Sequence, residues 1–140
     1  MLRLVTCLLL SLLVSLPALA ERKQSFAEVD VHYSVFNSSF LQPDTASAVG
    51  LVRSKNQGVV TVSVLKAGKP LPAEVKGEVK NLLGQVTPLS FKQVTEPGAA
   101  YYLAQFPLST REILTFTLDV QGGDGSNNRV SFNQEVFPDE

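Results

Sequence analysis

The sequence of 140 residues has only one cysteine, one methionine and one histidine. The cysteine, Cys7, and the methionine, Met1, both lie in the segment 1–20, so His32 is the one member of this group beyond it. Thiolates and imidazoles are the side chains from which most transition-metal sites and many nucleophilic active sites are built. Residues 21–140 therefore offer little material for such sites, and they must fold without disulfide bonds.

An excess of charge of one sign is also missing. The chain has 12 basic and 13 acidic residues, and its lysines and arginines are scattered, with no basic run after Lys23. Without Arg3, which lies in the segment 1–20, 11 basic residues remain against the same 13 acidic ones, a net charge of −2. Such a balance argues against nucleic acid, or an anionic membrane held by charge, as the binding partner.

The segment 1–20 has the organisation of a secretory signal peptide. Arg3 gives a positive start, residues 4–16 are apolar, and Pro17 precedes the small-residue cleavage signal Ala18-Leu19-Ala20. We therefore expect cleavage after Ala20 and a periplasmic location for residues 21–140. These would form a single domain with no stable membrane insertion.

An uncleaved membrane anchor is the alternative interpretation of this segment. A helix needs about 20 apolar residues to span the hydrocarbon of a bilayer, whereas the run over 4–16 is shorter and includes Thr6 and Ser11. No other segment of the sequence is long and apolar enough to span a membrane. The length of the run therefore favours the signal peptide.

Beyond residue 25 the pattern is one of short β-strands separated by turns. Val29, Val31 and Tyr33 alternate with polar residues, which is typical of a strand with one buried face. Pro43 and Gly50 bracket a segment that predicts one or two helical turns over 43–49. Alternating or β-branched runs bounded by turn residues predict the strands 29–35, 59–65, 75–79, 86–95, 100–106, 113–120 and 129–137.

About seven strands at near-regular spacing predict an all-β fold, an immunoglobulin-like antiparallel β-sandwich. A small closed barrel is the alternative. Pro88 has no N–H to donate, so the strand over 86–95 should lie at a sheet edge or contain a bulge. The inward strand positions predict a core of Val31, Tyr33, Val60, Val62, Val64, Val79, Phe91, Tyr102, Leu114, Phe116, Leu118, Val130 and Phe132.

Two parts of the sequence resemble known families. From Val60 to Val120, strands flank the turn Ala67-Gly68-Lys69-Pro70 and the segment Pro97-Gly98-Ala99-Ala100-Tyr101-Tyr102. This layout resembles exported immunoglobulin-like accessory domains of the FixH and YtkA-like group, and the resemblance implies their sandwich fold. The histidines and methionines used by copper-handling relatives of such domains are missing here, which argues against a metal role.

The second resemblance covers nearly all of residues 21–140. Residues 31–43 and 50–55, followed by Asn81-Leu82-Leu83-Gly84 and by residues 101–107, resemble an uncharacterised family of small exported proteins of Gram-negative bacteria. That family is known only as a domain of unknown function. The resemblance implies a periplasmic protein with the sandwich fold, and it brings no catalytic residues.

The candidate reactive groups have simple structural interpretations. His32, with Asp30 beside it, would be the base of a hydrolase whose nucleophile is a nearby serine, but the serines at 34, 38 and 39 lack the sequence context of a nucleophile elbow or triad. Asp124 lies in a glycine-rich loop with Asn127 and Asn128, yet calcium loops use more carboxylates. A structural histidine and a hairpin loop are favoured, and we predict no catalytic, metal-binding or cofactor-binding residue.

The segment from Phe36 to Lys55 forms a longer connection than a sandwich requires, and long ordered connections often carry function. We hypothesise that Asn37, Phe40 and Arg53 present a mixed apolar and cationic patch to a protein partner. In the alternative interpretation, Phe36, Phe40 and Leu41 only cap one open end of the sandwich.

These features favour a non-catalytic periplasmic accessory or binding module that contacts another envelope protein. A small-molecule or metal-ion binder is the alternative, and a hydrolase that uses His32 and a serine is the second alternative.

Overall fold

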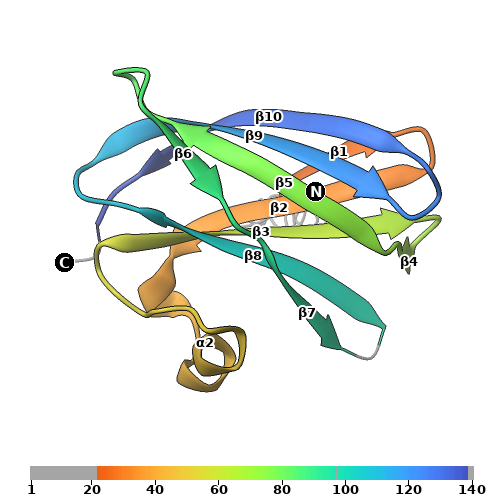
Figure 1. The fold of residues 1–140 in the computed structure, drawn as a ribbon, viewed down its shortest axis with the longest axis horizontal. Coiled ribbons are helices and arrows are strands. Elements are labelled where there is room, and N and C mark those ends of the chain that lie inside the picture. Colours follow the sequence, from red (N-terminus) through yellow and green to blue (C-terminus); the bar gives the residue numbers. More distant parts are fainter. Residues whose placement is uncertain (1–21, 97, 139–140) are drawn as a thin grey trace, which may run out of the picture.

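The computed structural model describes residues 22–96 and 98–138, which form two antiparallel β-sheets packed face to face (Figure 1). The predicted all-β sandwich is confirmed, and the barrel alternative is wrong because both sheets are open. The predicted signal peptide lies outside the described residues. Within the described residues, no helix has the length and apolar composition that crossing a bilayer requires.

The first sheet has six strands in the order β1-β2-β3-β8-β7, with β4 paired to β3. Its strands are β1 (Arg22–Phe26), β2 (Val29–Asn37), β3 (Gln57–Lys66), β4 (Lys69–Pro70), β7 (Lys92–Glu96) and β8 (Ala99–Pro107). The second sheet has four strands in the order β10-β9-β5-β6. They are β5 (Ala73–Lys80), β6 (Val86–Leu89), β9 (Glu112–Gly122) and β10 (Asn127–Val136).

Two of the strands differ from the sequence prediction. The segment 86–95 is not one strand, because Ser90 and Phe91 carry the chain from β6 in the second sheet to β7 in the first. Pro88 lies in β6 at the edge of its sheet, as its missing N–H predicts. The strand β1 is not predicted by the pattern. Its polar residues are held by backbone pairing with β2, from Arg22 opposite Tyr33 onward.

A column of aromatic rings joins the two sheets in the core. Tyr33 of β2 stacks on Phe132 of β10 with ring centroids 4.2 Å apart, and Phe132 stacks on Phe116 of β9 at 5.1 Å. Phe116 then meets Phe106 of β8 edge to face at 5.2 Å. All the predicted core residues are buried except Phe91, which is half-buried where the chain crosses between the sheets.

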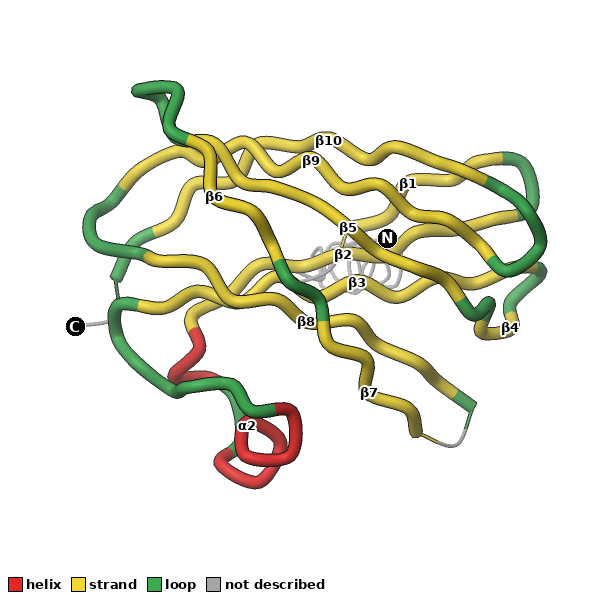
Figure 2. The backbone as a smooth tube through the Cα atoms, in the orientation of Figure 1, coloured by secondary structure: helices red, strands yellow, loops and turns green. Residues whose placement is uncertain are grey.

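The long connection between β2 and β3 covers the outer face of the six-stranded sheet. It contains the 3-10 turn η1 (Ser38–Phe40) and the helix α2 (Pro43–Val49), which forms where helical turns are predicted. Figure 2 shows this helical segment in red beside β3, β8 and β7. Leu41 and Ala46 pack there against Val59 and Leu103, which point outward from the sheet, and form a second small core. The connection therefore has a structural role that the strand pattern does not reveal.

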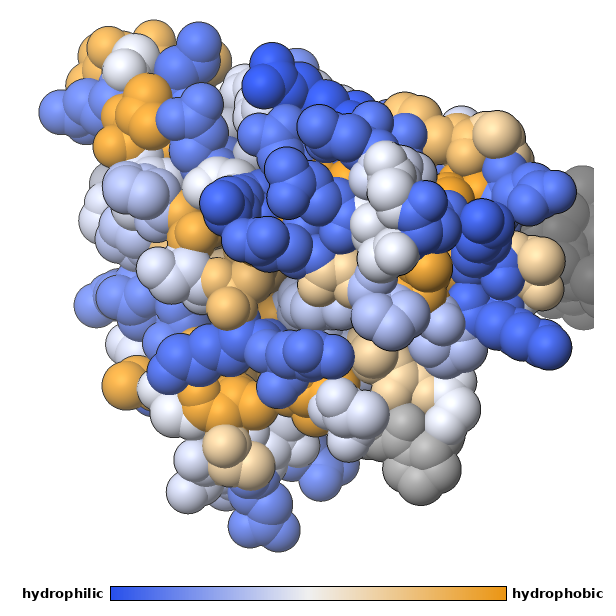
Figure 3. Space-filling view, turned by 45° about the vertical axis from the view of Figure 1, so that its right-hand side comes forward, coloured by the Kyte–Doolittle hydropathy of each residue, from blue (hydrophilic) through white to orange (hydrophobic). Residues whose placement is uncertain are grey.

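On the face of the sandwich drawn in Figure 3, polar residues cover most of the surface and apolar residues gather in a few places. Figure 3 shows one such place at the projecting corner formed by the turn between β5 and β6. Leu82 and Leu83 occupy this turn, with exposed fractions of 77% and 84%.

We predict that Phe116→Ala lowers the free energy of unfolding by about 3–5 kcal/mol, because it removes a fully buried ring and leaves a cavity. Thr117→Ala, on the opposite face of the same strand, should cost less than about 1 kcal/mol. Chemical denaturation measures both values. Similar losses for the two variants would contradict the register of β9.

Candidate functional site

Side chains of β1 bridge the seam between the two sheets at Arg22 and Gln24. The Arg22 guanidinium donates to the Gln134 side chain at 2.8 Å and to the Asn133 carbonyl at 3.4 Å. The same guanidinium lies over the rings of Tyr33 and Phe132, at 5.1 and 4.8 Å from their centroids. These contacts tie β1, in the first sheet, to β10 at the edge of the second.

Beyond Arg22 the seam widens into a groove of about 220 Å³, here called the end groove. Its walls include Val35 of β2 and Val136 of β10, and the buried ring of Phe106 lies at its base. Phe40 and Phe137 form its two sides, and they are 72% and 59% exposed. The end groove therefore extends inward from the two exposed rings of Phe40 and Phe137 to Phe106, which belongs to the aromatic column of the core.

The end of the groove is fixed by a hydrogen bond between distant parts of the chain. The Asn37 side-chain amide donates to the Phe137 carbonyl at 3.2 Å. On the other side, Ser38 is fully buried, its hydroxyl donates to the Ser54 carbonyl, and the Ser54 N–H donates to the same hydroxyl, both at 2.8 Å. This pair of bonds anchors η1 and so holds Phe40 at the rim.

The arrangement suits an apolar side chain of another protein better than a small organic ligand. Small-molecule sites usually have volumes of about 300–1,000 Å³, and the end groove is smaller. Its polar lining groups, Asn37, Gln134 and Glu135, lie beside an apolar base. Glu135 forms an ion pair of 2.6 Å with Arg111. An apolar centre with a polar rim is the usual composition of a protein–protein contact.

The structure brings two of the three predicted partner-surface residues together. Asn37 and Phe40 both line the end groove, but Arg53 is not among its lining residues. The Arg53 guanidinium donates instead to the Ser39 carbonyl at 3.1 Å, so it supports the turn that carries Phe40. Of the three proposed end caps, Phe40 has a largely exposed ring, and Phe36 is half-buried and lines the end groove. Leu41 lies under α2 on the outer face of the sheet.

Sequence reasoning missed most of the groove residues, among them Phe106, Val136 and Phe137. Phe137 follows the last strand, so it does not belong to an alternating pattern of apolar residues. The groove arises only where the ends of β2 and β10 meet. No local signal in the sequence places residues 100 positions apart, such as Asn37 and Phe137, beside each other.

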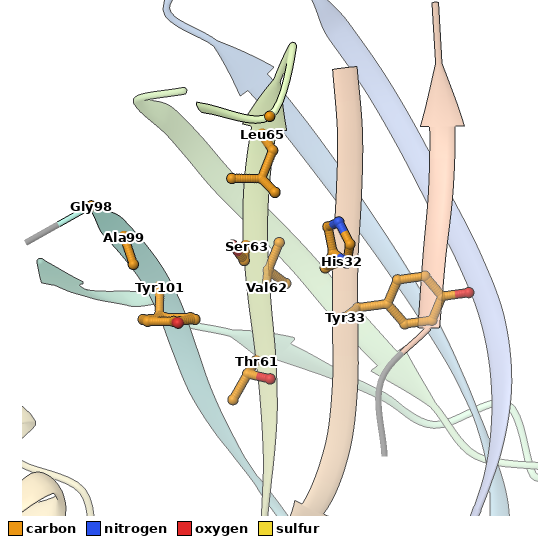
Figure 4. A pocket seen from close by; sticks show the side chains of 10 residues that line it. His32, Tyr33, Thr61, Val62, Ser63, Leu65, Gly98, Ala99 and Tyr101 are labelled. Carbon is orange, nitrogen blue, oxygen red and sulfur yellow. The ribbon is translucent and has the colours of Figure 1, made fainter. Parts of the chain in front are cut away.

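His32 lies on the outer face of the six-stranded sheet, in a second hollow of about 300 Å³ (Figure 4). Pairing of β2 with β3 places Ser63 opposite His32, and Thr61 and Tyr101 also line the hollow. Ser34 and Ser38, considered as nucleophiles from the sequence, are not among the lining residues. The serine that the fold places beside the imidazole is thus Ser63.

The glycine-rich loop between β9 and β10 holds its single carboxylate in hydrogen bonds. Asp124 accepts from the Lys66 ammonium at 2.8 Å on one oxygen, and from the Ser126 hydroxyl and N–H at 2.6 and 3.0 Å on the other. The bond from Lys66, followed by those from Ser126, holds the pKa of Asp124 well below its usual range. In the described residues there is no group of three or more His, Cys, Asp or Glu side chains placed to hold a metal ion.

We predict that Asp124→Asn lowers the melting temperature slightly at pH 7. Because the carboxyl pKa is depressed in the folded protein, the stabilisation is present above the ordinary carboxyl pKa of about 4 and is lost as the pH falls below it. The difference from wild type should therefore shrink in acid, and also in high salt, since the pair is exposed. Lys66→Gln should behave in the same way. Unchanged melting temperatures in both variants would contradict a stabilising pair.

The sequence profile of the family described as "Domain of unknown function (DUF4426)" matches residues 23–139. The chain belongs to this family. A crystal structure of a DUF4426 family protein from Pseudomonas aeruginosa is similar to this DUF4426 protein with a TM-score of 0.83 and 55% sequence identity. The match covers 89% of this chain and 100% of that one. No curated protein matches the sequence.

More distant structures share the fold of this DUF4426 protein. A copper-bound variant of FetP from uropathogenic Escherichia coli has a TM-score of 0.65 at 12% identity, covering 85% of this chain and 96% of that one. FetP as isolated after expression in the periplasm of E. coli has a TM-score of 0.62 at 11% identity, covering 86% and 96%. At these identities the likeness shows the sandwich fold alone.

Proposed function

We propose that this DUF4426 protein is a non-catalytic accessory or binding module of the periplasm that docks to another envelope protein through the end groove. The observation that carries the proposal is the pair of exposed rings, Phe40 and Phe137, beside a groove with the core residue Phe106 at its base. Buried aromatic side chains supply much of the binding energy at protein interfaces.

The periplasmic location is supported by the sequence of the segment 1–20, which ends in the cleavage signal Ala18-Leu19-Ala20. The fold is also that of FetP, which was isolated after expression in the periplasm. A non-catalytic role is supported by the position of His32. This histidine lies on the open outer face of a sheet, whereas the end groove opens between the sheets.

We predict that Phe40→Ala and Phe137→Ala each weaken binding of the envelope partner by roughly tenfold or more, as expected for aromatic interface residues. The partner is first captured from an envelope extract with the wild-type protein, then purified and titrated. Tyr101→Ala is the matched control, because it removes an exposed aromatic ring outside the groove.

Both groove variants should keep melting temperatures close to wild type, since the two rings are largely exposed. The proposal fails if the partner binds all three variants and the wild type alike. It also fails if the loss at Tyr101→Ala equals the loss at the groove positions.

A small-molecule or metal-ion binder is a second candidate, favoured by the hollow at His32. Its volume of about 300 Å³ reaches the lower limit of small-molecule sites, and a FetP variant of the same fold is copper-bound. A single imidazole would need further ligands, for which Ser63 and Tyr101 are the neighbouring groups. A melting-temperature shift with a ligand or with Cu²⁺ that disappears in His32→Ala would support this candidate. If neither Cu²⁺ nor any small molecule tested shifts the melting temperature of the wild type, this second candidate function is ruled out.

A further inference from the structure

A third hollow opens between the two sheets where β2 and β10 begin, at the end opposite the end groove. It lies between the turn that joins β1 to β2 and the turn that joins β9 to β10, both on the right-hand side of Figure 1, and is here called the turn hollow. Its volume of about 660 Å³ falls within the range of about 300–1,000 Å³ that is usual for small-molecule sites. Residues of both sheets line it.

An asparagine lines the turn hollow at a position where the strand pattern favours an apolar residue. Asn128 lies opposite the fully buried Val120 of β9 and two residues before the buried Val130, so its side chain points between the sheets. Its side-chain nitrogen is buried, and it forms no hydrogen bond with any part of the chain that the structure describes. A donor buried without an acceptor opposes folding, and the nearly isosteric leucine would avoid this cost. The asparagine is therefore suited to bond an acceptor atom of a bound molecule.

The turn hollow also has an apolar surface, which two core residues of the first sheet supply. Val29 of β2 is buried, and Phe26 at the end of β1 lies opposite it and packs half-buried against the core. Both residues line the turn hollow. A molecule in the hollow can therefore bury an apolar group against these two side chains while one of its oxygen atoms accepts from Asn128.

The charged groups that line the turn hollow disfavour an anion as the occupant. Lys66 supplies an ammonium, but this group is already bonded to Asp124 at 2.8 Å, and the other oxygen of Asp124 accepts from Ser126. Glu28 adds a second carboxylate at the exposed rim. One positive charge thus stands against two negative ones, so an occupant with an acceptor oxygen but no negative charge fits best.

The walls of the turn hollow are fixed by bonds to other parts of the chain. The Gly123 N–H of the β9–β10 turn donates to the Pro72 carbonyl at 2.6 Å, and the Ala67 N–H donates to the Glu28 carbonyl of the β1–β2 turn at 3.2 Å. Ala27, which lines the hollow, has a φ of 55°, a left-handed conformation that costs free energy in a residue other than glycine. Walls held in this way reduce the ordering that binding would otherwise require.

We propose that the turn hollow binds a small uncharged organic molecule that carries a carbonyl group next to an apolar group. The carbonyl oxygen accepts from the Asn128 side chain, and the apolar group packs against Phe26 and Val29. The turn hollow shares no lining residue with the end groove or with the hollow at His32. Binding of this molecule is therefore separate from the docking of a protein partner at the end groove.

N-acetyl-L-leucine methylamide is the probe for the test, because it is uncharged and joins carbonyl groups to an apolar side chain. N-acetyl-L-leucine, in which a carboxylate replaces the methylamide, is the matched anion. Each compound is titrated into the isotope-labelled protein while the NMR resonances of the Asn128 side-chain amide are followed. We expect the methylamide to shift these resonances and the anion to bind at least about threefold more weakly, because the carboxylates of Asp124 and Glu28 repel it.

A second measurement uses Asn128→Leu, which should weaken binding of the methylamide about tenfold or more because the hydrogen bond to the carbonyl is lost. The same variant should melt at or above the wild-type temperature, since it removes a buried donor. Asn133→Leu is the matched control. It makes the same change on the outer face of β10, where the side chain accepts from the Thr115 hydroxyl at 2.8 Å, so binding of the methylamide should not change.

The proposal is overturned if the methylamide leaves the Asn128 resonances unshifted, or if it shifts residues of the end groove or of the His32 hollow instead. Equal binding to Asn128→Leu and to the wild type would also overturn it. So would a melting temperature of Asn128→Leu clearly below that of the wild type, because the amide would then be bonded within the protein, for example by an ordered water. Equal or tighter binding of N-acetyl-L-leucine would contradict the assignment to an uncharged molecule.

Discussion

The aromatic column of Tyr33, Phe132, Phe116 and Phe106 is the interaction on which the sandwich depends. It takes two rings from each sheet, and it runs from the β1–β10 seam to the base of the end groove. A Cβ atom at Gly58 would clash with the Phe106 ring, so the glycine of β3 creates the space in which this ring lies. The groove is therefore a continuation of the core, and its base is as firmly packed as the rest of the column.

The contact of Arg22 with the column explains why a short polar strand is ordered at all. Its guanidinium lies over Tyr33 and Phe132 and also bonds β10, so one side chain combines cation–π contact with closure of the seam. The sequence pattern could not predict β1, because the strand lacks apolar alternation. The hairpin that starts β2 also uses Ala27, with φ of 55°, where Asn-Gly is the usual signal.

Strands with one solvent-exposed face were predictable from their alternation of apolar and polar residues, as Val31 and Tyr33 of β2 illustrate. The division of residues 86–95 into two strands was not predictable. The chain changes sheets at Ser90 and Phe91, and which sheet each half joins depends on pairing with strands that are distant in the sequence. For the candidate site, composition pointed to Asn37 and Phe40. Their partners Val136 and Phe137 come from the other end of the chain, and only the packed sheets bring them together.

Hydrogen bonds between distant parts of the chain occur at both ends of the sandwich. At the end where β3 meets β4, polar bonds join the sheets. Lys66 pairs with Asp124, and the Tyr102 hydroxyl of β8 accepts from the Ala73 N–H of β5 at 2.9 Å. At the end where β2 and β10 end, the Asn37 amide donates to the Phe137 carbonyl beside the end groove. Hollows remain beside both sets of bonds: the end groove at one end and, at the other, the turn hollow of about 660 Å³, lined by Phe26, Lys66 and Asp124. The polar bonds therefore seal neither end, and the stacked rings of the aromatic column in the middle hold the two sheets together.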